Sequence, residues 1–207
     1  MPQPLPVKCH LNHETMVVHY RPDLAILIAR VATTWTWVEE ALGRLFVQVL
    51  GTHARTGLMM YQALSSTAAQ KAVLRAAAAD RLTPEMQQKL EAALKDFQSA
   101  ARRRNAIVHG LWRLSDDHPD ALVWCDVGDH LFDHGDFWAG YRAHAERGEE
   151  FEFARNFKGT KKRMLLYKKQ DFLDVLEAIV DVGNRLQSLI RETDAALYSR
   201  KKQAGEE

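Results

Sequence analysis

An apolar stripe with the period of an α-helix runs through residues 24–49 and limits the fold more than any other feature of the sequence. Its members follow one another at spacings of four and three residues, which places their side chains on one face of a helix. Pro22 and Asp23 provide a helix start and Gly51 a stop. We therefore expect one long amphipathic helix whose buried face is formed by Leu24, Ile28, Val31, Trp35, Val38, Leu42, Leu45 and Val49.

The same period returns twice later in the chain. Thr83-Pro84-Glu85 is a helix start with Thr as N-cap, and a stripe over residues 86–107 leads to a stop at Gly110. Two shorter helices are expected over residues 56–64 and 67–80, the second capped by the serines that precede it. The last long helix begins near residue 170, and its stripe contains Phe172, Leu176, Ile179, Leu186, Leu189 and Leu197.

The helical period disappears between residues 111 and 167. Residues 111–114 and 121–125 resemble strands joined by a turn-rich hexapeptide, and residues 163–167 would add a third strand. These patterns predict a mainly α-helical protein, an up-and-down bundle of four to five helices with a small β insertion.

The expected organisation is a single domain with short appendages. We expect a flexible leader over residues 1–22, one helical domain over residues 23–199 that includes the charged, β-containing insertion at 111–167, and a polar tail over residues 200–207.

The overall charge excludes some classes of function. A formal net charge of +1 and an isoelectric point near 7.9 give no general nucleic-acid or membrane signature. No run approaches the roughly 20 apolar residues that a membrane span requires. Cys9 and Cys125 lack the close spacing of a zinc or redox pair, which suits a reducing compartment. We expect a cytoplasmic protein with no membrane contact, metal or cofactor.

The stretch from Arg102 to Gly110 places cationic and imidazole groups at the end of an apolar helix. Arg104 falls inside the apolar stripe, and Glu39 is a carboxylate on a side of the first helix that is expected to face the core. A buried carboxylate needs a cationic partner. One interpretation is therefore structural: Arg104 pairs with Glu39, and His109 caps the C-terminus of its helix, where cations are favourable.

The sequence Arg104-Asn105-Ala106-Ile107-Val108-His109, at the end of a long helix, resembles the Arg-x(4 to 6)-His motif of the HEPN superfamily (higher eukaryotes and prokaryotes nucleotide-binding domains). The wider layout is also similar, with a glutamate on a Trp-containing first helix, an Arg-Asn-x-x-x-His-Gly-x-Trp run ending at Trp112, a polar insertion and a closing helix. The resemblance covers most of the chain in outline, and the nine residues 104–112 carry it specifically.

The resemblance implies a helical bundle that pairs with a second copy, so that two motifs form one cleft and cut RNA without a metal. His109 would take a proton from a ribose 2′-hydroxyl, and His109 of the second copy would protonate the leaving 5′-oxygen. Arg104 would hold the scissile phosphate, and Asn105 would orient the histidine or a phosphate oxygen. The products would be a 2′,3′-cyclic phosphate and a 5′-hydroxyl. For such an endoribonuclease of the defence or toxin type, an antitoxin or regulatory protein is a further expected partner.

Helix geometry leaves two arrangements open. On an unbroken helix, with about 100° per residue, Arg104 and His109 differ by roughly 140° in azimuth, whereas Arg102, Asn105 and His109 share a face. Either the helix ends before His109, or Arg104 lies outside the cleft and Arg102 faces the phosphate, with Arg103 as a further RNA contact. The rival function is a non-catalytic module that binds nucleotide or a partner protein, with Arg104 and Glu39 as scaffold.

A second group of basic residues lies at the end of the insertion. Residues 155–169 contain seven basic residues and no acidic one, whereas residues 115–152 contain eleven acidic residues and two arginines. Lys161, Lys162 and Arg163 are candidate contacts for single-stranded RNA. The simpler interpretation is a solvated loop that offsets the acidic insertion.

Two further features have weaker interpretations. Asp129, His130, Asp133 and His134 have the i, i+4 spacing of metal ligands on a helix, but no third histidine completes the set and a polar loop is the simpler explanation. Trp37 points away from the apolar stripe of the first helix, which favours a homodimer interface unless another element covers it. We expect the small sheet and its insertion to be anchored to the bundle by Trp112, Trp124 and Trp138.

Overall fold

The computed structural model describes residues 1–6, 9, 11, 17–147 and 164–204. Within these residues it contains six α-helices, a short 3-10 helix at Val17–Tyr20 and one four-stranded sheet. The predicted mainly α-helical fold with a small β part is confirmed. The chain divides into two compact units: unit 1 comprises Met1–Val31 and Arg103–Val175, and unit 2 comprises Ala32–Arg102 and Leu176–Glu207.

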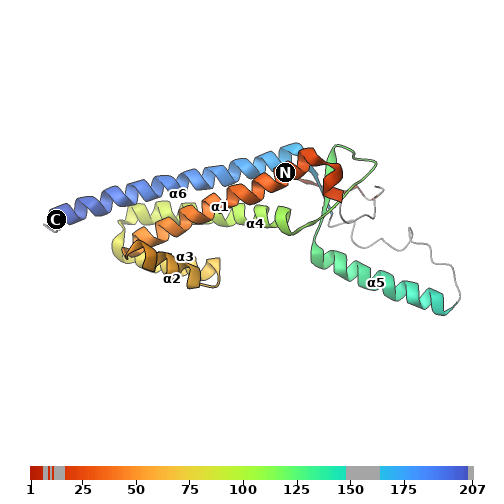
Figure 1. Ribbon diagram of the computed structural model, residues 1–207, viewed down its shortest axis with the longest axis horizontal. Coiled ribbons are helices and arrows are strands. Elements are labelled where there is room, and N and C mark those ends of the chain that lie inside the picture. The colour runs from red at the N-terminus through yellow and green to blue at the C-terminus, as the bar shows by residue number, and fades with distance from the viewer. Residues whose placement is uncertain (7–8, 10, 12–16, 148–163, 205–207) are drawn as a thin grey trace. The chain divides into compact units, whose positions relative to one another are not determined.

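Three long helices carry the three apolar stripes found in the sequence (Figure 1). They are α1 (Pro22–Leu50), α4 (Pro84–His109) and α6 (Lys169–Ala204), and each contributes residues to both units. Buried side chains follow the predicted stripes, because each helix keeps one apolar face away from water. Among the described residues, no helix is long and apolar enough to cross a membrane.

Aromatic contacts hold α1 to its neighbours within unit 2. The rings of Trp35 and Phe97 join α1 to α4 at a centroid distance of 4.9 Å. Phe46 meets Tyr61 of α2 (Ala54–Ala63) edge-on at 5.3 Å. Gly51 ends α1 with a φ of 64°, the left-handed conformation that favours glycine.

The helix α3 (Thr67–Arg81) begins where the sequence predicts and ends one residue later than expected. The Ser66 hydroxyl accepts a hydrogen bond from the Ala69 N–H, which caps the first turn. At the other end, Arg81 donates to the Leu50 carbonyl at 2.8 Å and so satisfies a free acceptor at the end of α1.

Unit 1 contains the sheet, whose strand order is β1-β4-β3-β2 with antiparallel pairing. The strands are β1 (Gln3–Pro4), β2 (Leu111–Arg113), β3 (Ala121–Cys125) and β4 (Leu165–Lys168). β3 has the predicted bounds, whereas β4 begins two residues later than expected. The segment expected as a flexible leader contributes β1, and Leu5 and Cys9 from it are buried in a cluster with β3 and β4 residues.

A helix replaces part of the segment that the sequence analysis read as non-helical. α5 (Val127–Glu146) follows β3 directly, and the Asp126 carboxylate caps it by accepting from the Gly128 and Asp129 N–H groups. The expectation was wrong because the apolar residues of α5 lie on several sides and three glycines interrupt them, so no single stripe marks the helix.

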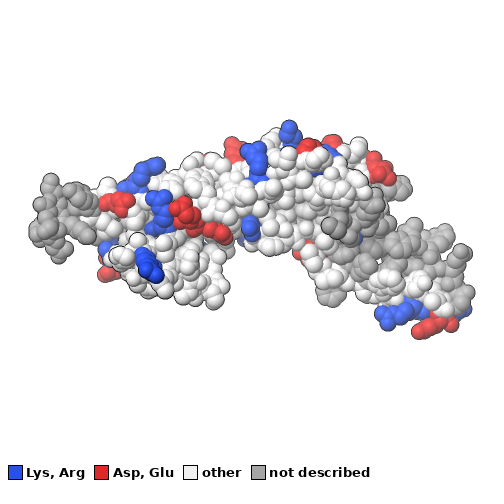
Figure 2. Space-filling view, viewed as in Figure 1, with Lys and Arg blue, Asp and Glu red and all other residues white. Residues whose placement is uncertain are grey.

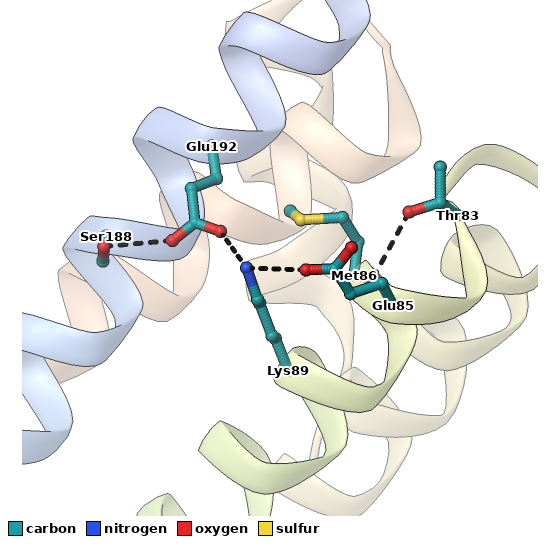
Figure 3. A network of polar contacts seen from close by, with 6 residues as sticks. All are labelled: Thr83, Glu85, Met86, Lys89, Ser188 and Glu192. Carbon is teal, nitrogen blue, oxygen red and sulfur yellow. Dashed lines mark hydrogen bonds and ion pairs between the residues drawn. The ribbon is translucent and has the colours of Figure 1, made fainter.

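Ion pairs join α4 to α6 within unit 2. Lys89 Nζ lies 2.8 Å from Glu192 Oε2 and 3.3 Å from Glu85 Oε1, and the Ser188 hydroxyl donates to the second oxygen of Glu192 at 3.2 Å (Figure 3). Seven residues further along α4, Asp96 accepts from Arg185 of α6 at 2.6 Å. Figure 2 shows that basic and acidic residues are interspersed over the face in view.

Candidate functional site

The candidate motif lies at the C-terminal end of α4, and part of it faces solvent. α4 continues without a break through His109. Asn105 and His109 are therefore one turn apart on one helical face, and both side chains are exposed. Arg102, one turn earlier in the same row, is exposed as well. Of the two expected arrangements, the structure has the one in which the helix does not end before His109.

Two tryptophans of the sheet fix the last turn of α4. The Trp124 indole N–H donates to the Ala106 carbonyl at 2.6 Å, and the Trp112 indole N–H donates to the Ile107 carbonyl at 3.2 Å. The Ala106 carbonyl also accepts the Gly110 N–H at 3.1 Å, so the Trp124 indole is its second donor. The last carbonyls of a helix lack a partner inside the helix, and the Trp112 indole supplies one for Ile107. The predicted anchoring role of these two tryptophans is confirmed, and it holds the backbone that carries Asn105 and His109.

Gly110 directly follows the last helical residue, at a point where the Trp124 indole lies very close to the backbone. A Cβ atom at this position would lie 1.8 Å from Trp124 Nε1. Among the described residues, only Gly51 has a positive φ, so Gly110 does not end α4 through a left-handed conformation. Its missing side chain instead makes room for the indole that bonds the Ala106 carbonyl.

Arg104 is linked to the exposed face of α4 by a hydrogen bond to Asn105. Its Nη1 donates to the Asn105 side-chain oxygen at 3.0 Å. The side chain is half-buried, and its Nε is a buried donor without a hydrogen-bond partner among the described residues. Because the carbonyl oxygen of the Asn105 amide is occupied, its NH₂ group is left as the exposed donor beside His109.

Arg103 is half-buried and lies in the electrostatic environment of Tyr167 on β4. Burial raises the pKa of the Tyr167 phenol above its usual value, the Asp171 carboxylate raises it further, and the charge of Arg103 opposes both. The Arg103 guanidinium is therefore close enough to β4 for its charge to act on Tyr167.

Glu39 is exposed, contrary to the expectation that it faces the core. Its Oε1 accepts the Trp35 indole N–H at 2.7 Å. Burial and the Glu39 charge together raise the pKa of Tyr61 to about 12. Because the carboxylate has water and the indole as partners, it does not require a buried cation. Its pairing with Arg104 stays a prediction.

The structure corrects the expectations for two further tryptophans, Trp37 and Trp138. Trp37 is partly buried, and its ring occupies the space over Gly183 of α6, where a Cβ would lie 2.0 Å from Trp37 Cζ3. The alternative that another helix covers Trp37 is therefore correct, and the residue no longer supports self-association. Trp138 was expected to be an anchor, but it is 47% exposed on α5 and meets the Tyr141 ring edge-on.

Several candidate residues lie outside the described part of the chain. Lys161, Lys162 and Arg163 belong to this group, so their RNA-binding role stays a prediction. The possible metal ligands 129, 130, 133 and 134 all fall within α5. Of their side chains the structure describes only Asp129, and the described residues contain no group of three that would hold a metal ion.

Two lysines of unit 2, one on α4 and one on α3, were not among the candidate residues predicted from the sequence. Lys95 is exposed on α4, seven residues before Arg102, and Lys71 of α3 donates to Gln98 of α4 at 3.4 Å. The absence of acids from residues 65–79 is a signal that points to Lys71, whereas Lys95 lies outside the acid-free stretch 97–115 and has no such signal.

No protein-family model matches the sequence, and comparisons with curated proteins and with solved structures return no match.

Proposed function

We propose that the protein is a metal-independent endoribonuclease of the HEPN type. The observation that carries the proposal is the pair formed by Asn105 and His109, exposed one turn apart at the fixed end of α4. An imidazole exposed beside an amide donor has the groups that a general acid-base step at a phosphodiester needs.

His109 accepts the proton of the ribose 2′-hydroxyl, and the resulting alkoxide attacks the adjacent phosphorus. The exposed NH₂ group of Asn105, oriented by Arg104, donates to a non-bridging phosphate oxygen. Arg102 supplies the positive charge on the same face, because it is the exposed arginine of the row. The 5′-oxygen leaves with a proton, giving a 2′,3′-cyclic phosphate and a 5′-hydroxyl.

A second copy of the chain supplies the acid in this proposal. The imidazole that accepts the 2′-hydroxyl proton lies on one side of the phosphorus. The leaving 5′-oxygen is on the opposite side, so a second group has to protonate it. His109 of the second copy would protonate that oxygen, so the active form is a homodimer in which two α4 ends face one RNA strand.

The test is RNA cleavage in the presence of EDTA. We expect His109→Ala to lower the rate by about 10²- to 10⁴-fold, the range for loss of a general acid-base group, with the melting temperature unchanged because the side chain is exposed. His53→Ala is the matched control, because His53 is another exposed histidine. A substrate with 2′-deoxyribose at the scissile position should resist cleavage. Full cleavage by His109→Ala would contradict the proposal.

The half-buried guanidinium of Arg104 supports a second candidate, a non-catalytic module that binds nucleotide or a partner protein. In that case Arg104 shapes the helix end and His109 is only a cap. The wild-type chain would then bind RNA or nucleotide without producing cyclic phosphate ends. Arg104→Ala would lower the melting temperature strongly, and His109→Ala would lower it only by the small contribution of a helix cap.

A further inference from the structure

The helices α3 and α4 lie antiparallel within unit 2, and two contacts give their register. Arg75 Nε lies 2.6 Å from Glu91 Oε1, and Lys71 Nζ lies 3.4 Å from Gln98 Oε1. The residue number falls along α3 as it rises along α4. The first half of α3 is therefore beside the later part of α4 that leads to Arg102.

These two helix segments are the ones that lack acids. Residues 65–79 and 97–115 contain no Asp or Glu. Antiparallel packing places the acid-free part of α3 beside residues 97–102 of α4. Lys95 lies just before this stretch. The two acids nearest to it on α4 are already bound, Glu91 by Arg75 and Asp96 by Arg185, so the surface keeps an excess of positive charge. A surface of this kind attracts polyanions, although the chain as a whole is almost neutral.

The cations of this surface are not used in ion pairs. Lys95 and Arg102 are exposed and have no ion pair with any described residue. Lys71 donates to the neutral Gln98 amide, and its charge is a minor cause of the lowered pKa of Glu91, which Arg75 binds directly. By contrast, Arg75 and Lys89 of the same helix pair are each bound to carboxylates. The three unpaired cations therefore contribute little to folding and keep their charge for a ligand.

We propose that Lys71, Lys95 and Arg102 form a binding surface for the sugar-phosphate backbone of single-stranded RNA. Seven residues separate Lys95 from Arg102 along α4, a rise of about 10 Å that spans neighbouring phosphates of an extended strand. Because the contacts are charges to phosphates, binding is independent of base sequence. The inference rests on the proposed function, since the ligand is the RNA on which the proposed nuclease would act.

The test compares two triple variants with equal loss of charge, both in a His109→Ala background that does not cut the probe. Lys71→Gln/Lys95→Gln/Arg102→Gln removes the surface, and Arg44→Gln/Arg55→Gln/Arg191→Gln removes three exposed charges elsewhere in unit 2. The probe is a short fluorescein-labelled single-stranded RNA, and anisotropy gives its affinity across a salt series.

We expect the first variant to bind about 100-fold more weakly near 0.1 M salt, because three phosphate contacts at about 0.7 released ions each lower the slope of log K against log salt by about 2. The second variant should keep the wild-type slope. Equal slopes for the two variants would overturn the inference. Circular dichroism checks folding, and Arg102→Gln alone should lower the slope by about 0.7 if the triple variant fails to fold.

The two proposals fail in different ways. If His109→Ala abolishes cleavage but the two triple variants bind alike, the catalytic proposal stands and the binding surface is wrong. If the wild type binds RNA through these cations but produces no cyclic phosphate ends, the surface stands and the catalytic proposal is wrong.

Discussion

Lys89, in the first half of α4, is held by Glu85 and Glu192, whereas Arg102, in the second half of the same helix, has no ion pair with any described residue. Both are exposed cations on one amphipathic helix, so helix propensity and exposure do not explain why only Lys89 forms ion pairs. The difference lies in what packs against each half: carboxylates of α4 and α6 near Lys89, and an acid-free part of α3 near Arg102. A cation that the fold leaves unpaired is available for a ligand.

The largest effect is expected at Gly110, which ends the second half of α4. Gly110→Ala forces a Cβ against the Trp124 indole, and overpacking of this kind lowers the free energy of unfolding by about 1–3 kcal/mol. The loss should also displace His109 and reduce cleavage. Urea unfolding measures the effect. Gly135→Ala is the control, because no atom lies within 4 Å of a Cβ there, and equal stability of both variants would refute the role given to Trp124.

A smaller effect, on activity alone, is expected for Arg104→Lys. Lysine keeps the charge but lacks the guanidinium that reaches the Asn105 oxygen. Misorientation of the Asn105 amide should lower kcat about tenfold, within the range for small positional errors in active sites, with KM and melting temperature little changed. Arg44→Lys, at an exposed position of α1, provides the control. An unchanged kcat would mean that the Asn105 amide has no part in the reaction.

The paired half of α4 should show the opposite behaviour, an effect on stability alone. Glu91→Gln removes the partner of Arg75 and should lower the free energy of unfolding by roughly 0.2–1 kcal/mol at neutral pH. Arg75 holds the pKa of Glu91 below its usual value. The pair therefore stabilises the fold above the ordinary carboxyl pKa and stops doing so as the pH falls through the lowered one.

Thermal unfolding between neutral and acid pH measures this contribution. In the Glu91→Gln variant the acid-induced loss of stability should be smaller than in the wild type. Arg102→Gln, in the unpaired half, should change neither the stability nor its pH dependence. A loss from Arg102→Gln as large as that from Glu91→Gln would remove the distinction between the two halves.

The smallest effect is expected for Glu39→Gln. An exposed carboxylate that accepts one indole N–H should cost less than about 1 kcal/mol on replacement by an amide, which also accepts. A buried pair with Arg104 would instead cost about 3–5 kcal/mol, so urea unfolding separates the two. Spectrophotometric titration should also find the Tyr61 pKa below its wild-type value of about 12, though still raised because burial is the larger cause.

Much of the helical architecture was predictable, and the exceptions have physical causes. The bounds of α1, α3 and α4 follow from local signals: Pro22 at a first turn, Ser66 as a cap and Gly110 as a stop. α5 escaped prediction because its apolar residues form no single stripe. The exposure of Glu39 was also missed, because the edge of an apolar stripe is in the core or in water depending on which helix packs there.

The candidate site divides in the same way. The helical period places Arg102, Asn105 and His109 on one face of α4, and all three are exposed, as this position requires. The bond from Arg104 to Asn105 and the indole contacts of Trp112 and Trp124 were not predictable in detail, because side-chain partners depend on rotamers and on the approach of the sheet.

Periodicity and caps act over a few residues, so the chain's own order of amino acids was enough to specify three long helices, the start of α3 and the strand β3. Which distant segments lie beside one another was determined only by the tertiary structure. Packing placed Trp37 over Gly183, Trp124 over Gly110 and the acid-free part of α3 beside that of α4, because these contacts depend on the register of elements far apart in the chain.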